Sequence, residues 1–237
     1  VRRVLGTLAL AVIAGACTTP RYLGSVGRDG AYANRGFGLL VRGAALQQRW
    51  SLIAPRRPEA APAARRPKLL EAPIDLNGDG YIDLGETRKH AKPTLRLISK
   101  TSTSALIDIQ VEILGGGAAD APLDAWVFGS LKHSNIATSS AAKDQAVATL
   151  KRREVSGRPT RGFEVSARRD GSAAKLRRAL IDQSEFAAEE GTKRRQVVVV
   201  DMWAPELNDE LRADHEALLD NIVLSASGGR ATSQETW

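Results

Sequence analysis

The stretch Ile107-Asp108-Ile109-Gln110-Val111-Glu112-Ile113 alternates apolar and polar residues over seven positions. A period of two places the isoleucines and the valine on one face of a β-strand, and the acids and the glutamine on the other. A second stretch, Val197-Val198-Val199-Val200, is apolar at every position, which is typical of a central strand that is covered on both faces. Together these stretches predict a sheet with a buried centre.

Further strands are predicted around these two. Residues 37–41 and 49–53 are short β-prone runs, and Leu95, Leu97 and Ser99 alternate in another. From about residue 143 the chain is predicted to form a meander, in which turn signals separate four β-prone runs. The runs lie near 145–155, 162–168, 174–184 and 195–203, and the turns are Gly157-Arg158-Pro159, Asp170-Gly171-Ser172 and Glu190-Gly191-Thr192.

Two helices are predicted. Pro122 opens the first, which reaches Leu131. The second runs from Pro205 to about residue 222, with Leu207, Leu211, Leu218 and Ile222 in one buried stripe and His215-Glu216 on a solvent-exposed face. This order of elements predicts an α+β fold in which one antiparallel sheet is covered by helices.

The order also resembles the PsbP-like α/β/α sandwich. The residues that carry the resemblance are Gly36-Phe37-Gly38-Leu39 leading to Trp50-Ser51-Leu52, and Val197 to Val200 followed by 207–225. The resemblance implies a non-enzymatic fold, found in photosynthetic accessory proteins and bacterial lipoproteins.

The N-terminal residues predict export from the cytoplasm. Residues 1–16 combine Arg2 and Arg3 with a short apolar stretch and small residues, as secretory signal peptides do. The segment Ala14-Gly15-Ala16-Cys17 resembles a lipoprotein lipobox, which implies that Cys17 is acylated and becomes the mature N-terminus. The alternative is a plain secretory signal followed by an incidental cysteine. With Thr18 after the cysteine, the family's sorting rule implies an outer membrane lipoprotein that faces the periplasm or the cell surface.

The rest of the chain is predicted to form one domain with appendages. Residues 17–29 form a tether, 30–224 the α+β domain, and 225–237 a disordered tail. Within the domain, residues 56–67 contain almost only proline, alanine and arginine, which is typical of an extended linker.

The sharpest motif is Asp-Leu-Asn-Gly-Asp-Gly-Tyr-Ile-Asp-Leu-Gly-Glu at residues 75–86, which matches an EF-hand calcium loop at every position. Ca²⁺ prefers six to eight oxygen ligands, and Gly80 permits the sharp turn that brings them together. Pro73 and Pro93 shorten the flanking helices, which favours a single structural loop over a paired sensor. The alternative is an acidic turn without metal. The predicted ligands are Asp75, Asn77, Asp79, Tyr81 through its carbonyl, Asp83 and Glu86.

Composition limits the other classes of function. The 237 residues include 34 Lys and Arg against 27 Asp and Glu, but the positive charges are scattered, so we expect no nucleic acid partner. The single cysteine excludes an internal disulfide and a cysteine-based zinc site. If they share a face, three basic runs could contact anionic lipid or lipopolysaccharide; otherwise they form a solvated sheet edge. The runs are Lys151-Arg152-Arg153, Arg177-Arg178 and Lys193-Arg194-Arg195.

No catalytic signature is present in the sequence. It has no Gly-x-Ser-x-Gly elbow and no P-loop, and Leu219 stands where a zinc protease motif starting at His215 needs a second histidine. We therefore expect a non-enzymatic calcium-binding envelope lipoprotein that acts as an accessory or scaffold factor, with the membrane and an envelope protein as partners. One alternative is a carrier of lipid or a small ligand. The other is an envelope hydrolase that uses two of Asp108, Glu112, Asp201 and Glu206.

Overall fold

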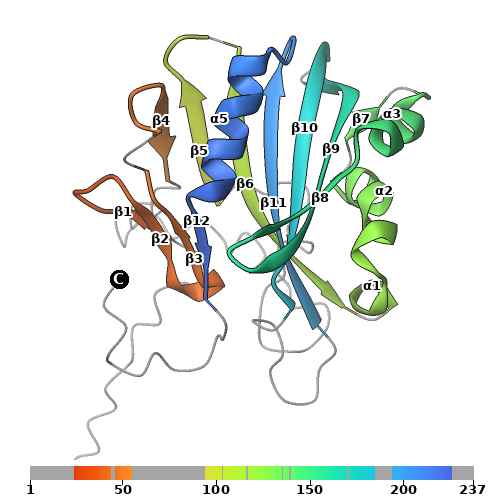
Figure 1. The fold of residues 1–237 in the computed structure, drawn as a ribbon, viewed down its shortest axis with the longest axis horizontal. Coiled ribbons are helices and arrows are strands. Elements are labelled where there is room, and N and C mark those ends of the chain that lie inside the picture. The colour runs from red at the N-terminus through yellow and green to blue at the C-terminus, as the bar shows by residue number, and fades with distance from the viewer. Residues whose placement is uncertain are drawn as a thin grey trace, which may run out of the picture.

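The computed structural model describes residues 24–43, 46–54, 94–102, 104–115, 117–134, 136–138, 140–169, 171–184 and 194–225. These residues form two antiparallel sheets and several helices, which confirms the predicted α+β class (Figure 1). The four-stranded sheet has the order β1-β2-β3-β12, where β1 is Ser25–Val26, β2 is Tyr32–Asn34, β3 is Leu39–Val41 and β12 is Ile222–Leu224.

The larger sheet has eight strands in the order β4-β5-β6-β11-β10-β9-β7, and β8 pairs with β9. Its strands are β4 (Trp50–Ile53), β5 (Leu95–Ser99), β6 (Leu106–Gly115), β7 (Ala137–Thr138), β8 (Lys151–Val155), β9 (Arg158–Arg169), β10 (Ser172–Asp182) and β11 (Arg194–Ala204). The helices are η1, a 3-10 turn (Arg35–Phe37), α1 (Gly117–Asp120), α2 (Leu123–His133), α3 (Ala142–Thr149) and α5 (Asp209–Asp220).

The centre of the larger sheet is buried on both faces, as the sequence predicts. Val198 and Val200 of β11 pack into a core with Leu211 and Leu218 from the α5 side. Val197 and Val199 pack into a second core with the apolar residues of α2. The two cores lie on opposite faces because neighbouring residues of a strand point to opposite sides.

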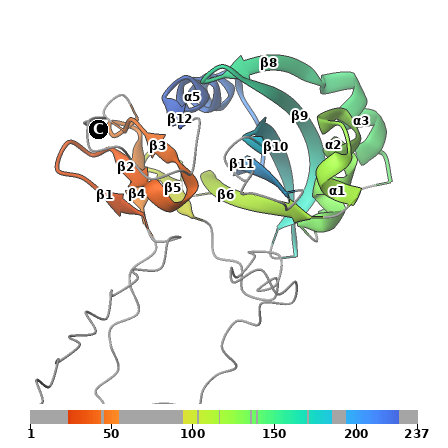
Figure 2. The same cartoon turned by 90° about the horizontal axis from the view of Figure 1, so that it is seen from below.

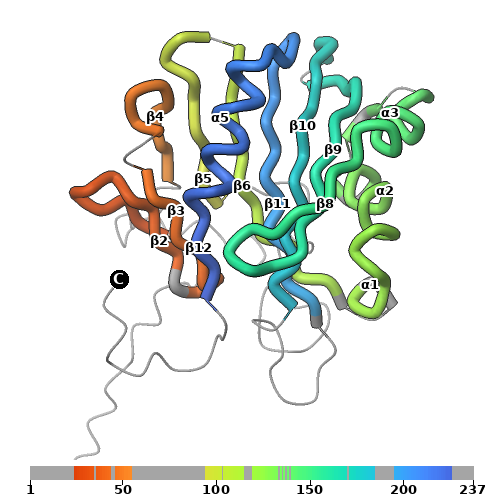
Figure 3. The backbone as a smooth tube through the Cα atoms, in the orientation of Figure 1, coloured from red at the N-terminus to blue at the C-terminus, as the bar shows by residue number. Residues whose placement is uncertain are grey.

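The larger sheet is strongly curved. Seen from below, it forms an arc with α1, α2 and α3 on the outside and α5 near its open side (Figure 2). At one end of the arc β8 approaches α5, and the backbone trace shows how the β8–β9 hairpin reaches toward β12 (Figure 3). The turn at the tip of that hairpin is tied to the smaller sheet, because Leu224 N–H donates to Ser156 Oγ at 3.0 Å.

The two predicted helices are confirmed, but α5 is shorter than expected. It begins at Asp209 rather than Pro205 because the side chain of Asn208 caps it, accepting a hydrogen bond from Leu211 N–H at 2.8 Å. It ends at Asp220, and Ile222 already belongs to β12, which pairs with β3. The predicted buried stripe is correct, since Leu207, Leu211, Leu218 and Ile222 are all buried.

The prediction of a strand near 145–155 is wrong for its first half, which forms α3. Strand β9 has β8 beside its first residues and β7 beside Ala167 and Arg168, so the stretch between them needs other hydrogen-bond partners. Helix α3 supplies them. Gln145 Oε1 accepts from Ser166 N–H at 2.7 Å, and Thr149 Oγ1 accepts from Glu164 N–H at 2.8 Å.

The described part of the meander has two of the predicted hairpins, one of them shifted, and the turn predicted at 190–192 lies outside the described residues. The turn predicted at 157–159 lies at Ser156-Gly157, whose φ angles are 53° and 70°, and Arg158 already starts β9. A two-residue turn with both φ angles positive matches the twist of the strands that it joins. The hairpin predicted at 170–172 is confirmed, because Arg169 pairs with Ser172.

Candidate binding groove

Two predicted sites lie outside the described residues: the lipidation residue Cys17 and the calcium ligands Asp75, Asn77, Asp79, Tyr81, Asp83 and Glu86. Both therefore stay predictions. Within the described ranges, no helix is long and apolar enough to cross a membrane. Those same ranges contain no cluster of three His, Cys, Asp or Glu side chains that could hold a metal ion.

Three of the four carboxylates proposed for a hydrolase lie on one face of the sheet. Asp108 and Asp201 are directly opposite each other on β6 and β11, and Glu112 lies on the same face of β6. All three are buried, with 4%, 2% and 8% of their surface exposed. Glu206 is not with them, since it borders a cavity on the α5 side. The polar face of β6 is thus an interior face, not a solvent face.

Arginines engage two of these buried carboxylates. Arg178 donates to both oxygens of Asp201, at 2.7 and 2.6 Å, and Arg96 donates to both oxygens of Asp108, at 2.6 and 3.0 Å. Arg169 adds a contact to Asp108 at 3.4 Å. Burial raises the pKa of Asp201, the Arg178 guanidinium opposes that rise, and the charges of Asp108 and Glu112 add to it. The arrangement is a buried ion pair, Arg178–Asp201, beside a half-buried pair, Arg96–Asp108.

The described surface is hollowed on the other face, between α5 and strands β8, β9 and β10. One cavity there has a volume of about 770 Å³, and a neighbouring cavity has a volume of about 480 Å³. Both are bordered by Thr149, Glu164 and Arg212, so the Glu164–Arg212 pair stands between them. We refer to the two cavities together as the α5 groove.

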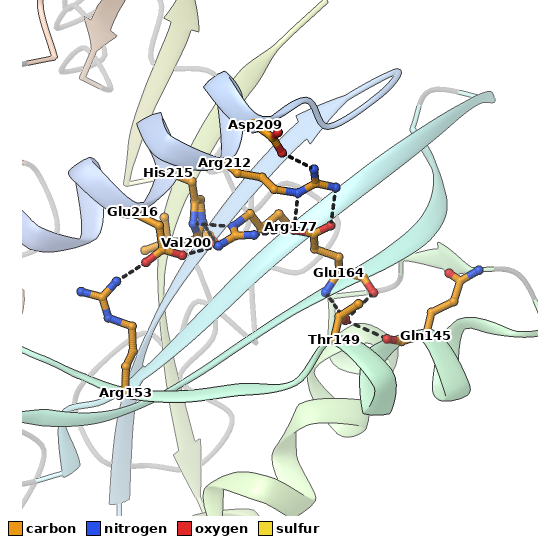
Figure 4. A network of polar contacts seen from close by, with 10 residues as sticks. All are labelled: Gln145, Thr149, Arg153, Glu164, Arg177, Val200, Asp209, Arg212, His215 and Glu216. Carbon is orange, nitrogen blue, oxygen red and sulfur yellow. Dashed lines mark hydrogen bonds and ion pairs between the residues drawn. The ribbon is translucent and has the colours of Figure 1, made fainter.

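A chain of alternating charges ties the walls of the α5 groove together. Arg177 of β10 lies at its centre and donates to Glu164 of β9 and to Glu216 of α5 (Figure 4). Arg212 donates to both oxygens of Glu164, at 3.0 and 3.1 Å. Arg153 of β8 donates to Glu216 in turn. In order, the chain runs Asp209–Arg212–Glu164–Arg177–Glu216–Arg153–Asp220.

The charge chain sets the ionisation of Glu164. Burial opposes ionisation of this carboxyl, but hydrogen bonds from Arg212 and Arg177 outweigh burial and lower its pKa. Glu164 therefore stays charged well below neutral pH. Because its two neighbours come from α5 and β10, the charged form holds the helix to the sheet.

His215 contacts Arg177, the central residue of the charge chain. The prediction that His215 is solvent-exposed is wrong. It is 1% exposed and points from α5 toward the sheet. Its Nδ1 accepts from Arg177 Nε at 3.2 Å, so the neutral ring carries its proton on Nε2, which lies 3.4 Å from the carbonyl oxygen of Val200. Burial, followed by the charge of Arg177, lowers its pKa to about 4. The ring is therefore neutral at pH 7.

The opposite flank of α5 is held by different residues. Trp50 Nε1 donates to Asp214 Oδ2 at 2.9 Å, and Arg49 Nε lies 3.2 Å from the same oxygen. Arg49 also pairs with Glu210. With polar contacts on both flanks, α5 forms a fixed wall of the groove.

Arg153 and Arg177 lie in basic runs that were considered for contact with anionic lipid, but the pairing of these arginines with acids was not predicted, although one signal for it was available. The hairpin predicted at Asp170-Gly171 has a two-residue loop, which sets the register of β9 against β10. In that register Glu164 is directly opposite Arg177. The partners on α5 have no comparable signal, because their contacts join residues far apart in the chain.

No protein-family model matches the sequence, and no curated protein is significantly similar to it. Among solved structures, the chain is similar to LpqN of Mycobacterium tuberculosis, which is described as involved in cell envelope biogenesis. The TM-score is 0.32 and the sequence identity 14%, covering 57% of this chain and 69% of that one. It is also similar to a Bacteroides thetaiotaomicron protein, with a TM-score of 0.28, 6% identity, and coverage of 55% and 38%. Both similarities cover little more than half of this chain.

Proposed function

We propose that this protein is a non-enzymatic calcium-binding accessory factor of a bacterial cell envelope. The observation that carries the proposal is the segment 75–86, which has a calcium-loop residue at every ligand position. Four acids within twelve residues, Asp75, Asp79, Asp83 and Glu86, repel one another unless a cation lies among them. An extracytoplasmic site of this kind binds calcium at about 10⁻⁴–10⁻³ M.

The geometry of the folded domain supports the non-enzymatic part of the proposal. A hydrolase that uses two carboxylates needs both of them beside a cleft, about 5–9 Å apart. Asp108 and Asp201 are neighbours, but both are buried and engaged by arginines, and Glu206 lies on the opposite face. No observation favours the hydrolase. One observation supports the alternative function as a carrier of lipid or a small ligand, because the α5 groove contains a cavity of about 770 Å³.

Calcium binding is tested by titration calorimetry on the full chain. We expect a saturable heat for the native sequence, and none for Asp75→Ala or Glu86→Ala, because each variant removes a ligand that the loop cannot replace. Asp144→Ala serves as the matched control, since Asp144 is exposed on α3. Equal heats for the native chain and Glu86→Ala would refute calcium binding by this loop.

Attachment to the membrane is a second part of the proposal. Cys17 is the only cysteine, so acylation on sulfur has one possible position. Two or three acyl chains anchor a protein stably, whereas one chain binds only marginally. We expect Cys17→Ser to move the protein from the membrane fraction to the soluble fraction of lysed cells. Mass spectrometry of the N-terminal peptide should show that the native mature protein begins at Cys17 and carries acyl chains there. A Cys17→Ser variant that stays in the membrane fraction would contradict the anchor.

The proposal includes a location and a partner. The outer membrane is the expected location, because Thr18 follows Cys17. An envelope protein is the expected partner, because an accessory factor without catalytic groups acts through binding. The PsbP-like resemblance belongs to the proposal as well. It is supported by a sheet with helices on both faces, α2 and α3 on one and α5 on the other.

A further inference from the structure

The larger cavity of the α5 groove carries more positive than negative side chains. Four cations, Lys151, Arg153, Arg177 and Arg212, border it together with two carboxylates, Glu164 and Glu216, which leaves a net charge of +2. Arg152 also borders the cavity, but its guanidinium pairs with Asp124 on α2. The two acids at the ends of the charge chain, Asp209 and Asp220, do not border the cavity and are exposed, so solvent screens their charges.

Lys151 borders the same cavity but is not part of the charge chain. It is exposed on β8, and it makes no hydrogen bond or ion pair with the described residues. It lies opposite Gly162, and Arg153 lies opposite Thr160, so both side chains point to the groove side of the sheet. Arg153 and Arg212 keep 30% and 40% of their side chains exposed. These three cations thus form a rim with donors still available to an anion.

Below this rim, part of the wall of the cavity is apolar, and Ala148, Ala179, Ala213 and Leu219 contribute to it. Gly162 keeps the wall open, because a Cβ at that position would meet only the Arg178 carbonyl oxygen, at 3.9 Å. The volume of about 770 Å³ lies in the range of pockets that hold small molecules.

We infer that the α5 groove binds a small amphiphilic anion, with a phosphate head on Lys151 and Arg153, which share one face of β8, and an apolar body against Gly162 and Leu219. The charge excess favours an anion, because its binding neutralises the net positive charge of a partly desolvated cavity. The apolar wall favours a body that leaves water on binding. The partly enclosed shape favours a single molecule over the flat surface of a membrane. This site is separate from calcium binding and from the membrane anchor.

The test uses decyl phosphate below its micelle concentration, titrated into the full chain carrying Cys17→Ser, which removes the need for detergent. Calorimetry should show saturable binding of decyl phosphate, much weaker binding of inorganic phosphate, and none of the neutral decyl maltoside. Lys151→Glu should weaken the affinity about tenfold, because a favourable contact at the rim becomes a repulsive one. Gly162→Leu should weaken it at least as much by filling the space for the apolar body.

The matched control is Lys132→Glu, the same charge reversal at an exposed position of α2 on the other face of the sheet. It should bind as the native chain does, and the melting temperature of each variant reports whether it folds. Equal affinities for Lys151→Glu and Lys132→Glu would overturn the assignment. So would equal binding of decyl maltoside, or binding to phosphatidylglycerol vesicles without binding of monomeric decyl phosphate.

Discussion

Replacing Arg178 with methionine should lower the free energy of unfolding by about 3–5 kcal/mol, the range found when one partner of a buried ion pair is removed. Arg178 and Asp201 have 0% and 2% of their side chains exposed, and Arg178 donates two hydrogen bonds to the carboxylate. Methionine leaves Asp201 without its counter-charge, beside Asp108 and Glu112, which already raise its pKa. Urea unfolding measures the loss.

Two further variants separate this effect from the loss of a side chain. The double change Arg178→Met with Asp201→Leu should recover most of the stability, because both polar partners are then replaced by apolar groups of similar size. Arg152→Met is the matched control on the same sheet, since Arg152 and Asp124 are 63% and 42% exposed, and it should cost less than about 1 kcal/mol. Equal losses for Arg178→Met and Arg152→Met would show that the buried pair has no special role.

Lowering the pH from 7 to 5 should reduce the free energy of unfolding by about 2 kcal/mol through His215 alone. Its pKa is about 4 in the folded protein, against 6.5 for an unperturbed histidine. Between these two values the unfolded chain binds a proton that the folded chain does not. Stability is therefore complete above about pH 6.5 and falls as the pH falls toward 4. The lowered pKa of Glu164 acts only at more acidic pH, below the value of an unperturbed glutamate.

The variant His215→Gln isolates this contribution. Glutamine stays neutral, can accept from Arg177 and can donate to the Val200 carbonyl, so the slope of stability against pH between 5 and 7 should become shallower. Urea unfolding at several pH values measures the slope. If His215→Gln kept the native slope, His215 would not be the buried neutral group that the structure shows.

The sequence predicted the elements whose pattern is local. Alternation around Ile109 defined β6, and the four valines at 197–200 defined a strand covered on both faces, because both patterns depend only on neighbouring residues. Residues 145–149 were predicted to belong to a β-prone run, but they form part of helix α3. Its helical form depends on Gln145 and Thr149, whose side chains bond the backbone of β9. Contacts between residues that are 15 or 21 positions apart produce no periodic pattern in the local sequence.

The burial of polar residues was likewise predictable only where it depends on neighbouring residues in the sequence. His215 was predicted to be exposed, yet it follows Leu211 by four residues and therefore belongs to the buried stripe of α5. Arg177 and Arg178 were predicted to form a surface run, or to contact lipid. In β10 they point to opposite faces, one to Glu164 and Glu216, the other to Asp201. Whether an arginine in a strand is buried depends on acids elsewhere in the chain, which composition and periodicity do not locate.

We propose that residues 75–86 bind calcium as part of the folded protein. The melting temperature of the chain in calcium and in chelator tests this proposal. At calcium about 100-fold above the dissociation constant, binding contributes about 2.7 kcal/mol, so chelator should lower the melting temperature by roughly 5–10 °C. Glu86→Ala should melt at one temperature in both solutions. A native chain whose melting temperature is the same with calcium and with chelator would contradict the claim.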